Sequence, residues 1–220
     1  MLNFKSSDSR RTKIQELSYP AVNWGVKNAM VINYTSSHDN HTLWDKLAVS
    51  RPEASEADRL AMNRLCAAAV LLSRGTPFFL AGEEFLRSKN GDSNSYASSD
   101  EVNNIVWDDL TPGSEALRMS EYYRGLIAVR RENAFLRSGS TPVCELLDGN
   151  VIAVTWSTGE ESTAYAVLNP GAETLELSAP EGWTDYRILL QGAQVSPEGT
   201  AASGVFRAEP CSVTLIIRNP

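Results

Sequence analysis

The stretch "AMVINYTSSHDNHTLWDKL", residues 29–47, passes from a short apolar run into polar residues. Its first part, residues 29–37, is apolar and β-branched and ends in small polar residues, which is typical of a buried parallel strand that leads into a functional loop. Both histidines of the chain, His38 and His41, follow this strand. Because barrel enzymes carry their reactive groups at the C-terminal ends of parallel strands, we expect His38 and Asp39 to face a common cleft.

A helix and a second strand are predicted next along the chain. Apolar residues recur at helical spacing from Ser55 to Ser73, with Ser55 as the expected N-cap and Gly75 as the expected stop. The run "TPFFLAG", residues 76–82, predicts a second short buried strand that ends sharply at its glycine. Strand, helix and strand in this order favour a parallel sheet covered by helices.

The next predictions are a long polar loop and a second long helix. Residues 87–104, "RSKNGDSNSYASSDEVNN", are almost wholly polar, and such a long loop after a strand is usually functional. The helix is expected over residues 114–133, with Leu117, Tyr122, Leu126, Ile127 and Val129 on its buried side. For residues 1–29 the sequence predicts only a loop or a short helix.

After residue 139 the sequence changes to short β-rich runs separated by turn residues. These runs are residues 143–147, 150–156, 163–169, 174–178, 186–190 and 211–218. Their regular spacing predicts an antiparallel β-sandwich. The two strands predicted upstream cannot form a parallel sheet alone, and a full barrel of eight strand-helix units needs about 250 residues. We therefore expect the region before residue 139 to be a piece of a larger parallel sheet.

Composition narrows the class of protein and of partner. The chain has 220 residues, 42% of them hydrophobic and 21% charged, as expected of a globular protein. A net charge of −7 disfavours nucleic acid and anionic membranes as partners. No apolar run approaches the ~20 residues that span a bilayer, and no signal-peptide pattern is present, so the compartment is not predicted. The three cysteines (Cys66, Cys144 and Cys211) lack the spacing of a disulfide framework or a zinc site.

Three blocks in order carry a resemblance to a known family. They are "NYTSSHDNHTLWDKL" (33–47), "GTPFFLAGEEFLRSK" (75–89) and "DSNSYASSDEVNNIVWD" (92–108). Together they resemble the end of the catalytic domain of a type I pullulanase, an α-1,6-cleaving debranching member of the α-amylase superfamily. The resemblance covers roughly residues 20–220 and is strongest over residues 32–108.

The resemblance implies a fold of α/β plus all-β class. Residues 1–139 would form the last two strand-helix units of a (β/α)₈ TIM barrel, and residues 140–220 a C-terminal antiparallel β-sandwich domain. The predicted strands at residues 29–37 and 76–82 would be the seventh and eighth strands of the barrel.

The resemblance also implies roles for the H-D-N string. Asp39 would be the third essential carboxylate, which grips the 2- and 3-hydroxyls of the sugar at the central subsite. Such bonds lower the barrier when they strengthen as the sugar ring flattens toward the oxocarbenium-like transition state. His38 would donate to a neighbouring hydroxyl of the same sugar. Asn40 would bind substrate or hold the loop.

The long polar loop would supply the adjacent subsite. Asn94 and Tyr96 match the segment that contacts the next sugar in such enzymes, and Arg87 and Asp100 would brace this segment. Oxygen-rich loops can bind calcium, but Asp92, Asn94 and Asp100 lack EF-hand spacing, so a structural calcium ion is not favoured. No metal site and no organic cofactor are expected.

Four further residues have weaker assignments. We expect His41 and Trp44 to support packing beneath the site, although an exposed Trp44 would offer a stacking platform for a sugar. Glu83 and Glu84 follow the second strand as a carboxylate pair, but by family position they are not the catalytic pair. They would orient the cleft, or else be exposed charges.

The two carboxylates that perform the chemistry are not found in the sequence. Retaining glycosidases need a nucleophile and an acid/base about 5 Å apart. In the family these are an aspartate in an R-x-D context and a glutamate, and neither block occurs here. We therefore expect part of an α-glucan debranching glycoside hydrolase that is inactive alone and self-associates through exposed barrel edges.

Two alternatives stay open. One is a non-catalytic α-glucan-binding accessory module, which exposed Trp156, Tyr165 or Trp183 would support, although core packing is expected for all three. The other is a partner polypeptide that supplies the remaining strands.

Overall fold

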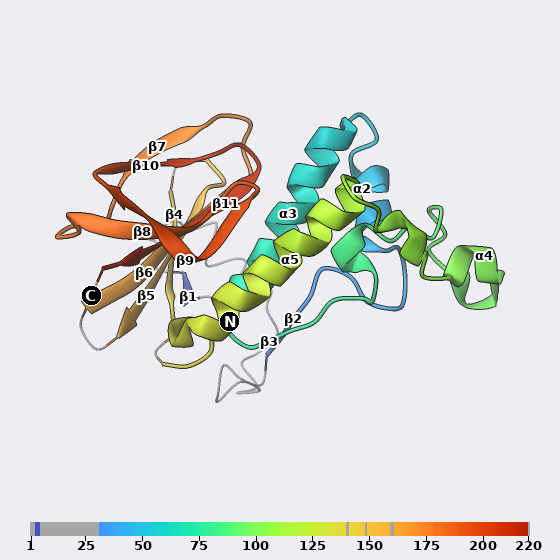
Figure 1. The fold of residues 1–220 in the computed structure, drawn as a ribbon, viewed down its shortest axis with the longest axis horizontal. Helices are drawn as coiled ribbons and strands as arrows, with labels where there is room; N and C mark the ends of the chain where they lie inside the picture. Colours follow the sequence, from blue (N-terminus) through green and yellow to red (C-terminus); the bar gives the residue numbers. More distant parts are fainter. Residues whose placement is uncertain (1–2, 5–30, 140, 148, 159–160, 220) are drawn as a thin grey trace.

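The computed structural model describes residues 3–4, 31–139, 141–147, 149–158 and 161–219 (Figure 1). The predicted loop or helix over residues 1–29 lies outside these ranges, apart from the two-residue strand β1 (Asn3–Phe4). The first half contains β2 (Ile32–Asn33), α2 (Leu43–Ser50), α3 (Glu56–Leu72), β3 (Thr76–Pro77), η2 (Glu83–Phe85), η3 (Ser95–Ala97), α4 (Asp100–Asn103), η4 (Trp107–Asp109), α5 (Glu115–Glu132) and η5 (Ala134–Leu136).

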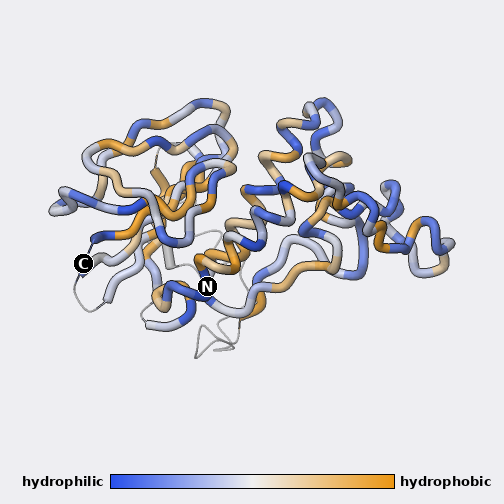
Figure 2. The backbone as a smooth tube through the Cα atoms, in the orientation of Figure 1, coloured by the Kyte–Doolittle hydropathy of each residue, from blue (hydrophilic) through white to orange (hydrophobic). Residues whose placement is uncertain are grey.

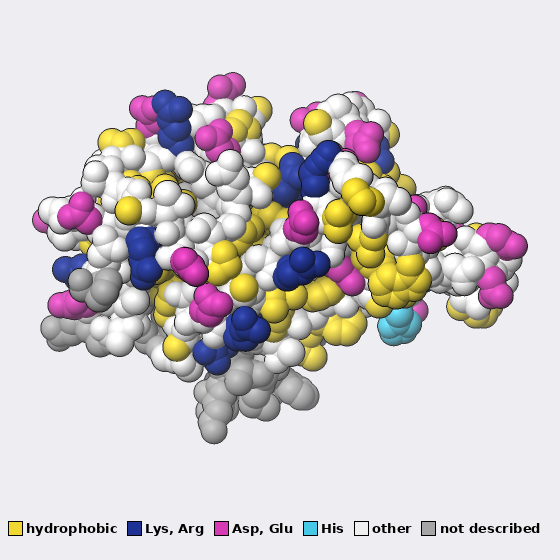
Figure 3. All heavy atoms as spheres, viewed as in Figure 1, with side chains coloured by type: hydrophobic (Ala, Val, Ile, Leu, Met, Phe, Trp, Pro, Cys, Tyr) yellow, Lys and Arg dark blue, Asp and Glu magenta, His cyan; other side chains and the backbone are white. Residues whose placement is uncertain are grey.

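The two expected strands of the first half pair in parallel across α3. Ile32 lies opposite Thr76 in this β2–β3 pair. The prediction that both strands are buried is wrong, because Ile32 is 61% exposed, Tyr34 58% and Phe78 43%. The pair is short, and the described residues leave part of its apolar surface uncovered. Figure 3 shows hydrophobic side chains at the surface of this half of the molecule.

Local signals place both long helices as predicted. Ser55 and Asp58 form a capping box at the start of α3, in which each side chain accepts from the backbone N–H of the other. Ser114 caps α5 by accepting from the N–H of Leu117. Ile127 is 44% exposed, contrary to prediction, because the buried stripe passes through its neighbour Leu126 and adjacent helical residues point about 100° apart.

The second half is built on a seven-stranded sheet. Its order is β1-β4-β5-β6-β11-β8-β9, and β7 and β10 form a separate antiparallel pair. The bounds are β4 (Val143–Leu146), β5 (Ile152–Thr158), β6 (Glu161–Asn169), β7 (Leu175–Ser178), β8 (Asp185–Gln191), β9 (Gln194–Ser203), β10 (Val205–Ala208) and β11 (Ser212–Arg218). All six predicted runs contain a strand.

Strands β9 and β10 were not predicted. β9 contains Pro197 and Gly199, which normally interrupt strands. It lies at an edge of the described sheet, with a register irregularity against β8, and edge strands tolerate a residue that cannot donate to the ladder.

Each face of the large sheet has its own hydrophobic core. One core joins the sheet to α3 and α5, and includes Leu71, Met119, Leu126, Trp156 and Leu215. The other joins it to the β7–β10 pair, and includes Trp183, Tyr186, Phe206 and Ile216. The predicted antiparallel sandwich is therefore present, with two helices packed on its outer face (Figures 1 and 2).

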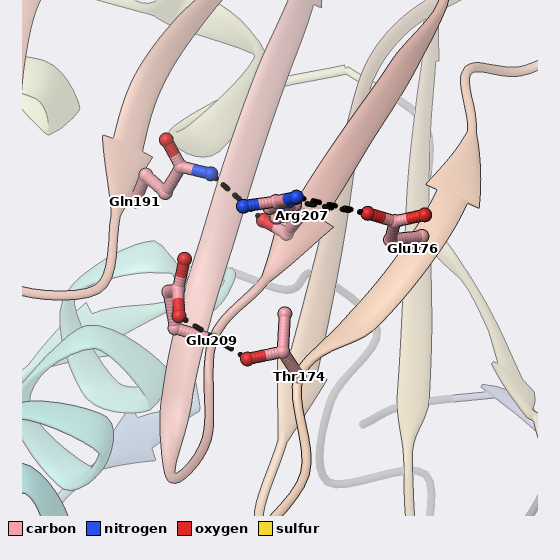
Figure 4. Close-up of polar contacts among 5 residues, drawn as sticks. All are labelled: Thr174, Glu176, Gln191, Arg207 and Glu209. Carbon is pink, nitrogen blue, oxygen red and sulfur yellow. Dashed lines mark hydrogen bonds and ion pairs between the residues drawn. The ribbon is translucent and has the colours of Figure 1, made fainter.

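Polar contacts around β10 lie within the small sheet and join it to β8 of the large sheet (Figure 4). Arg207 donates to Oε1 of Glu176 in β7 from Nη2, at 3.1 Å. Gln191 of β8 donates to the carbonyl of Arg207 at 3.0 Å, and Thr174 donates to the carboxylate of Glu209 at 3.4 Å. These contacts are exposed, so the buried apolar residues between the sheets supply most of the stabilisation.

Candidate functional site

An open cleft of about 570 Å³ lies beside the loop that follows β2. Its lining residues are His38, Asp39, Asn40, Lys89, Ser93, Asn94, Ser95, Tyr96 and Asn103. The five residues expected to contact substrate from two separate sequence blocks therefore share one cleft. Asp39 is the only carboxylate among the described lining residues.

The first wall of the cleft is the tight loop between β2 and α2. Asn40 adopts the left-handed conformation (φ 63°), which asparagine accepts more readily than most residues. Nε2 of His38 lies 3.4 Å from Oδ2 of Asp39, and these side chains are 82% and 77% exposed. Both polar groups are thus presented to a ligand, and their mutual attraction is weak because water screens it.

The second wall is the predicted long loop, which is folded on itself by hydrogen bonds that join its polar side chains to other side chains and to the backbone. Asp92 accepts from the hydroxyl of Ser98 at 2.5 Å and from the N–H of Asn94 at 2.8 Å, and these bonds lower the pKa of its carboxyl. The amide of Asn103 donates to the carbonyl of Ser95 at 2.7 Å. Tyr96 is 87% exposed, so its ring face is open for stacking.

Arg87 connects the turn after β3 to this loop. It donates to the carbonyl of Ala81 at 3.1 Å from Nη1 and to the carbonyl of Asn103 from Nη2. Its stem packs against Gly82 (φ 94°), where an added Cβ would lie 2.7 Å from Cδ of Arg87. Asp100 is exposed at the first turn of α4.

Glu83 and Glu84 do not line the cleft. Glu83 is 4% exposed and accepts from the hydroxyls of Ser36 and Tyr123, and burial raises the pKa of its carboxyl. Glu84 accepts from the N–H of Gly82 at 2.8 Å. Because Ser36 precedes His38 by two residues, Glu83 is hydrogen-bonded to the loop that carries His38, whereas Glu84 lies in the turn after β3.

Sequence reasoning did not single out the cleft-lining residues Ser93, Ser95 and Asn103, nor Lys89 and its partner Asp45. Asp45 is 5% exposed and accepts from the hydroxyl of Ser88 at 2.6 Å and from the N–H of Lys89 at 2.7 Å. Nζ of Lys89 donates to the carbonyl of His38 at 3.3 Å. The Thr42-x-x-Asp45 spacing is a helix-capping signal that could have revealed α2, since Thr42 accepts from the N–H of Asp45. No local pattern marks Lys89.

The aromatic platforms considered from sequence are not free surfaces. Trp44 is half-buried against the core, and the guanidinium of Arg59 lies 5.0 Å from its ring centroid. His41, three residues before Trp44, is also half-buried. In the sandwich, Trp156 is 3% and Trp183 is 7% exposed, and Tyr165 packs against Phe206.

Among the residues that the structure describes, His, Cys, Asp and Glu side chains form no group of three that could hold a metal ion. The helices of the same residues include none long and apolar enough to cross a membrane.

Comparison with known proteins tests the resemblance. No family model matches the chain. It is 42% identical to a pullulanase of Bacillus subtilis over 106 residues, which cover 48% of the chain and 14% of that protein. It is 31% identical to pullulanase A of Streptococcus pneumoniae over 225 aligned positions, which cover 81% of the chain and 17% of that protein.

Solved structures of pullulanases also match the chain. A type I pullulanase of Bacillus subtilis complexed with maltose matches 86% of the chain with a TM-score of 0.76 and 27% identity, over 27% of its own length. A pullulanase of Paenibacillus barengoltzii complexed with maltohexaose and α-cyclodextrin matches 89% of the chain with a TM-score of 0.74 and 30% identity, over 31% of its own length. The chain thus spans less than one third of each of these relatives. The chain is therefore related to the pullulanases and corresponds to a C-terminal portion of such a protein.

Proposed function

We propose that this chain carries one side of the α-glucan cleft of an α-1,6-debranching glycoside hydrolase. Residues 1–139 would be the last part of a (β/α)₈ barrel, with β2 and β3 as its final strands, and residues 140–220 its β-sandwich domain. The observation that carries the proposal is the convergence of His38, Asp39, Asn40, Asn94 and Tyr96 on one open cleft. Relatives solved with maltose and longer maltooligosaccharides support an α-glucan as the ligand.

In this proposal Asp39 stabilises the transition state. Its exposed carboxylate accepts hydrogen bonds from two sugar hydroxyls, and these bonds strengthen as positive charge develops on the sugar ring. His38 donates to an adjacent hydroxyl, and Asn94 and Tyr96 hold the next sugar. Asp39 alone cannot serve as nucleophile and acid/base together, so the 220-residue chain binds glucan without hydrolysing it.

The test measures turnover and binding separately. Reducing-end release from pullulan is measured for the pure chain, and maltotetraose binding is measured by calorimetric titration for the chain and for Asp39→Ala. Saturable binding that Asp39→Ala removes, without turnover, supports the proposal. Turnover by the chain itself would overturn the proposal that its catalytic site is incomplete. Absence of maltotetraose binding would overturn the proposal that the cleft binds α-glucan. Since Asp39 is exposed, its loss should leave the stability of the fold unchanged within about 0.5 kcal/mol.

We further propose that the chain self-associates through the uncovered β2–β3 surface. Ile32, Tyr34 and Phe78 expose apolar area there, and Tyr34 and Phe78 contact each other edge to face at 6.1 Å. Light scattering should show oligomers for the chain and a monomer for the Tyr34→Ser/Phe78→Ser variant. A monomeric parent chain would contradict this assignment.

A further inference from the structure

Lys89 is a buried cation in the wall of the cleft. It is 6% exposed, although lysine is almost never fully buried unless its charge is paired. The ion pairs among the described residues do not include Lys89. The cleft lining around it holds neutral polar side chains, His38 and the carboxylate residue Asp39, and the Lys89 ammonium also helps to lower the pKa of the nearby Asp92 carboxyl. The burial of this ammonium group beside the cleft therefore requires a physical explanation.

The ammonium is only partly satisfied by the described protein atoms. It carries three N–H donors, and Nζ donates to the carbonyl oxygen of His38 at 3.3 Å. Two donors are then available to a ligand in the cleft. The anchoring bond also fixes Nζ near the peptide unit that joins His38 to Asp39.

The backbone of Lys89 is held from both sides. Its N–H donates to Oδ2 of the buried Asp45 at 2.7 Å, and its carbonyl accepts from the N–H of Asp92 at 3.0 Å. Asp45 sits in the first turn of α2, directly after the loop that carries His38. Helix α2 therefore sets the position of both cleft walls, and the ammonium is oriented before any ligand arrives.

We propose that Lys89 contacts substrate directly, donating its remaining N–H groups to a hydroxyl oxygen of the bound α-glucan; this rests on the proposed function. A neutral polyhydroxylated ligand fits the mixed lining, because each hydroxyl can accept from Lys89 and donate to Asp39. An anionic ligand would gain from Lys89 but would be repelled by Asp39. Lys89 thereby adds a specificity-determining donor that the resemblance did not single out.

The first experiment removes the ammonium and keeps the stem. Binding of maltotetraose is measured by titration for the 220-residue chain, Lys89→Met, and the control Lys46→Met, which removes an exposed lysine of α2 outside the cleft. We expect Lys89→Met to weaken binding by about 10-fold or more, as for loss of a charge-assisted hydrogen bond, and the control to leave binding unchanged. Unchanged binding in Lys89→Met would overturn the proposal.

A second measurement separates contact from loop positioning. Maltotetraose analogues that each lack one hydroxyl are titrated against the chain and Lys89→Met. If Lys89 donates to a hydroxyl, removing that hydroxyl weakens binding to the parent chain but adds no further loss in Lys89→Met. If every analogue suffers the same loss with both proteins, Lys89 only positions the loop, and the proposal is overturned.

The failure of this inference is distinguishable from failure of the proposed function. Binding that Asp39→Ala removes but Lys89→Met retains would leave the cleft assignment standing and reject the role of Lys89. Absence of maltotetraose binding by the parent chain would reject both. Native-like circular dichroism and unfolding midpoints for each variant exclude misfolding as the cause of weaker binding.

Discussion

The hydroxyl of Tyr123 in α5 donates a 2.9 Å hydrogen bond to Oε1 of Glu83, which also accepts from Ser36. Three distant segments, the loop before His38, the turn after β3 and the helix on the sheet, thus meet at one buried carboxylate. We expect Glu83→Ala to lower the free energy of unfolding by about 2 kcal/mol or more, because two buried hydroxyls lose their acceptor and a cavity forms. Glu83→Gln keeps the volume and an acceptor, so urea unfolding should place it near the parent chain. Equal losses in both variants would contradict this network.

The same carboxyl gives a pH dependence with a definite sign. Burial raises its pKa above the ordinary value of 4.5, so the folded state holds this proton more tightly than the unfolded chain. The contribution to stability is therefore complete below pH 4.5 and is lost as the pH rises through the folded-state pKa. Unfolding midpoints measured across this range should fall less with rising pH in Glu83→Gln than in the parent. Parallel curves would reject the assignment.

Arg130 caps the C-terminal end of α3 from a neighbouring helix. Its Nη1 donates to the carbonyls of Leu71 (2.8 Å) and Ser73 (2.7 Å), and its Nη2 to that of Gly75 (2.6 Å). We expect Arg130→Met to cost about 2–3 kcal/mol in the free energy of unfolding, since helix-end carbonyls lose a charged donor.

The adjacent arginine supplies the control for this change. Arg131 is 76% exposed and pairs with Glu132 at 3.7 Å, so Arg131→Met should change stability by less than about 0.5 kcal/mol. Similar losses in the two variants, measured by urea unfolding, would show that the capping bonds contribute little.

Gly125 allows α5 to approach strand β9 closely. A Cβ at this position would lie 2.9 Å from Cβ of Val195. Gly125→Ala should therefore destabilise the chain by about 1–3 kcal/mol through overpacking, although alanine favours helix by roughly 1 kcal/mol. In a Val195→Gly background the same change should become stabilising. A penalty that persists without the Val195 side chain would place the strain elsewhere.

Asp45 joins α2 to the second cleft wall. Asp45→Ala removes the acceptor of the Lys89 N–H and of the Ser88 hydroxyl, so we expect a loss of about 2 kcal/mol. Amide hydrogen exchange at Lys89 should accelerate more than exchange within α5. The matched control, Asp58→Ala, removes an exposed acceptor at the start of α3 and should not affect Lys89. Unchanged hydrogen exchange of the Lys89 amide in Asp45→Ala would show that the Asp45 carboxylate does not hold the backbone of Lys89.

Features that depend on near neighbours along the chain could be predicted from the amino-acid sequence. The Ser55 and Ser114 caps with their apolar periodicity predicted α3 and α5. Gly82 does lie in a turn with a positive φ, but β3 ends at Pro77 and not at this glycine as predicted. Alternating β-rich runs predicted six of the sandwich strands. The candidate cleft residues came from spacing and resemblance, and the roles assigned to them stay predictions.

Tertiary structure alone decided what depends on distant partners. Pro197 and Gly199 oppose strand formation locally, yet β9 forms because it pairs with β8. Tyr34 belongs to a run that predicts burial, yet it is exposed where the described residues provide no cover. Asp45 and Lys89 are 44 positions apart, and their contact exists only because α2 and the long loop fold together. Burial and strand pairing arise only when the chain is folded, because the residues that contact each other are far apart in the sequence.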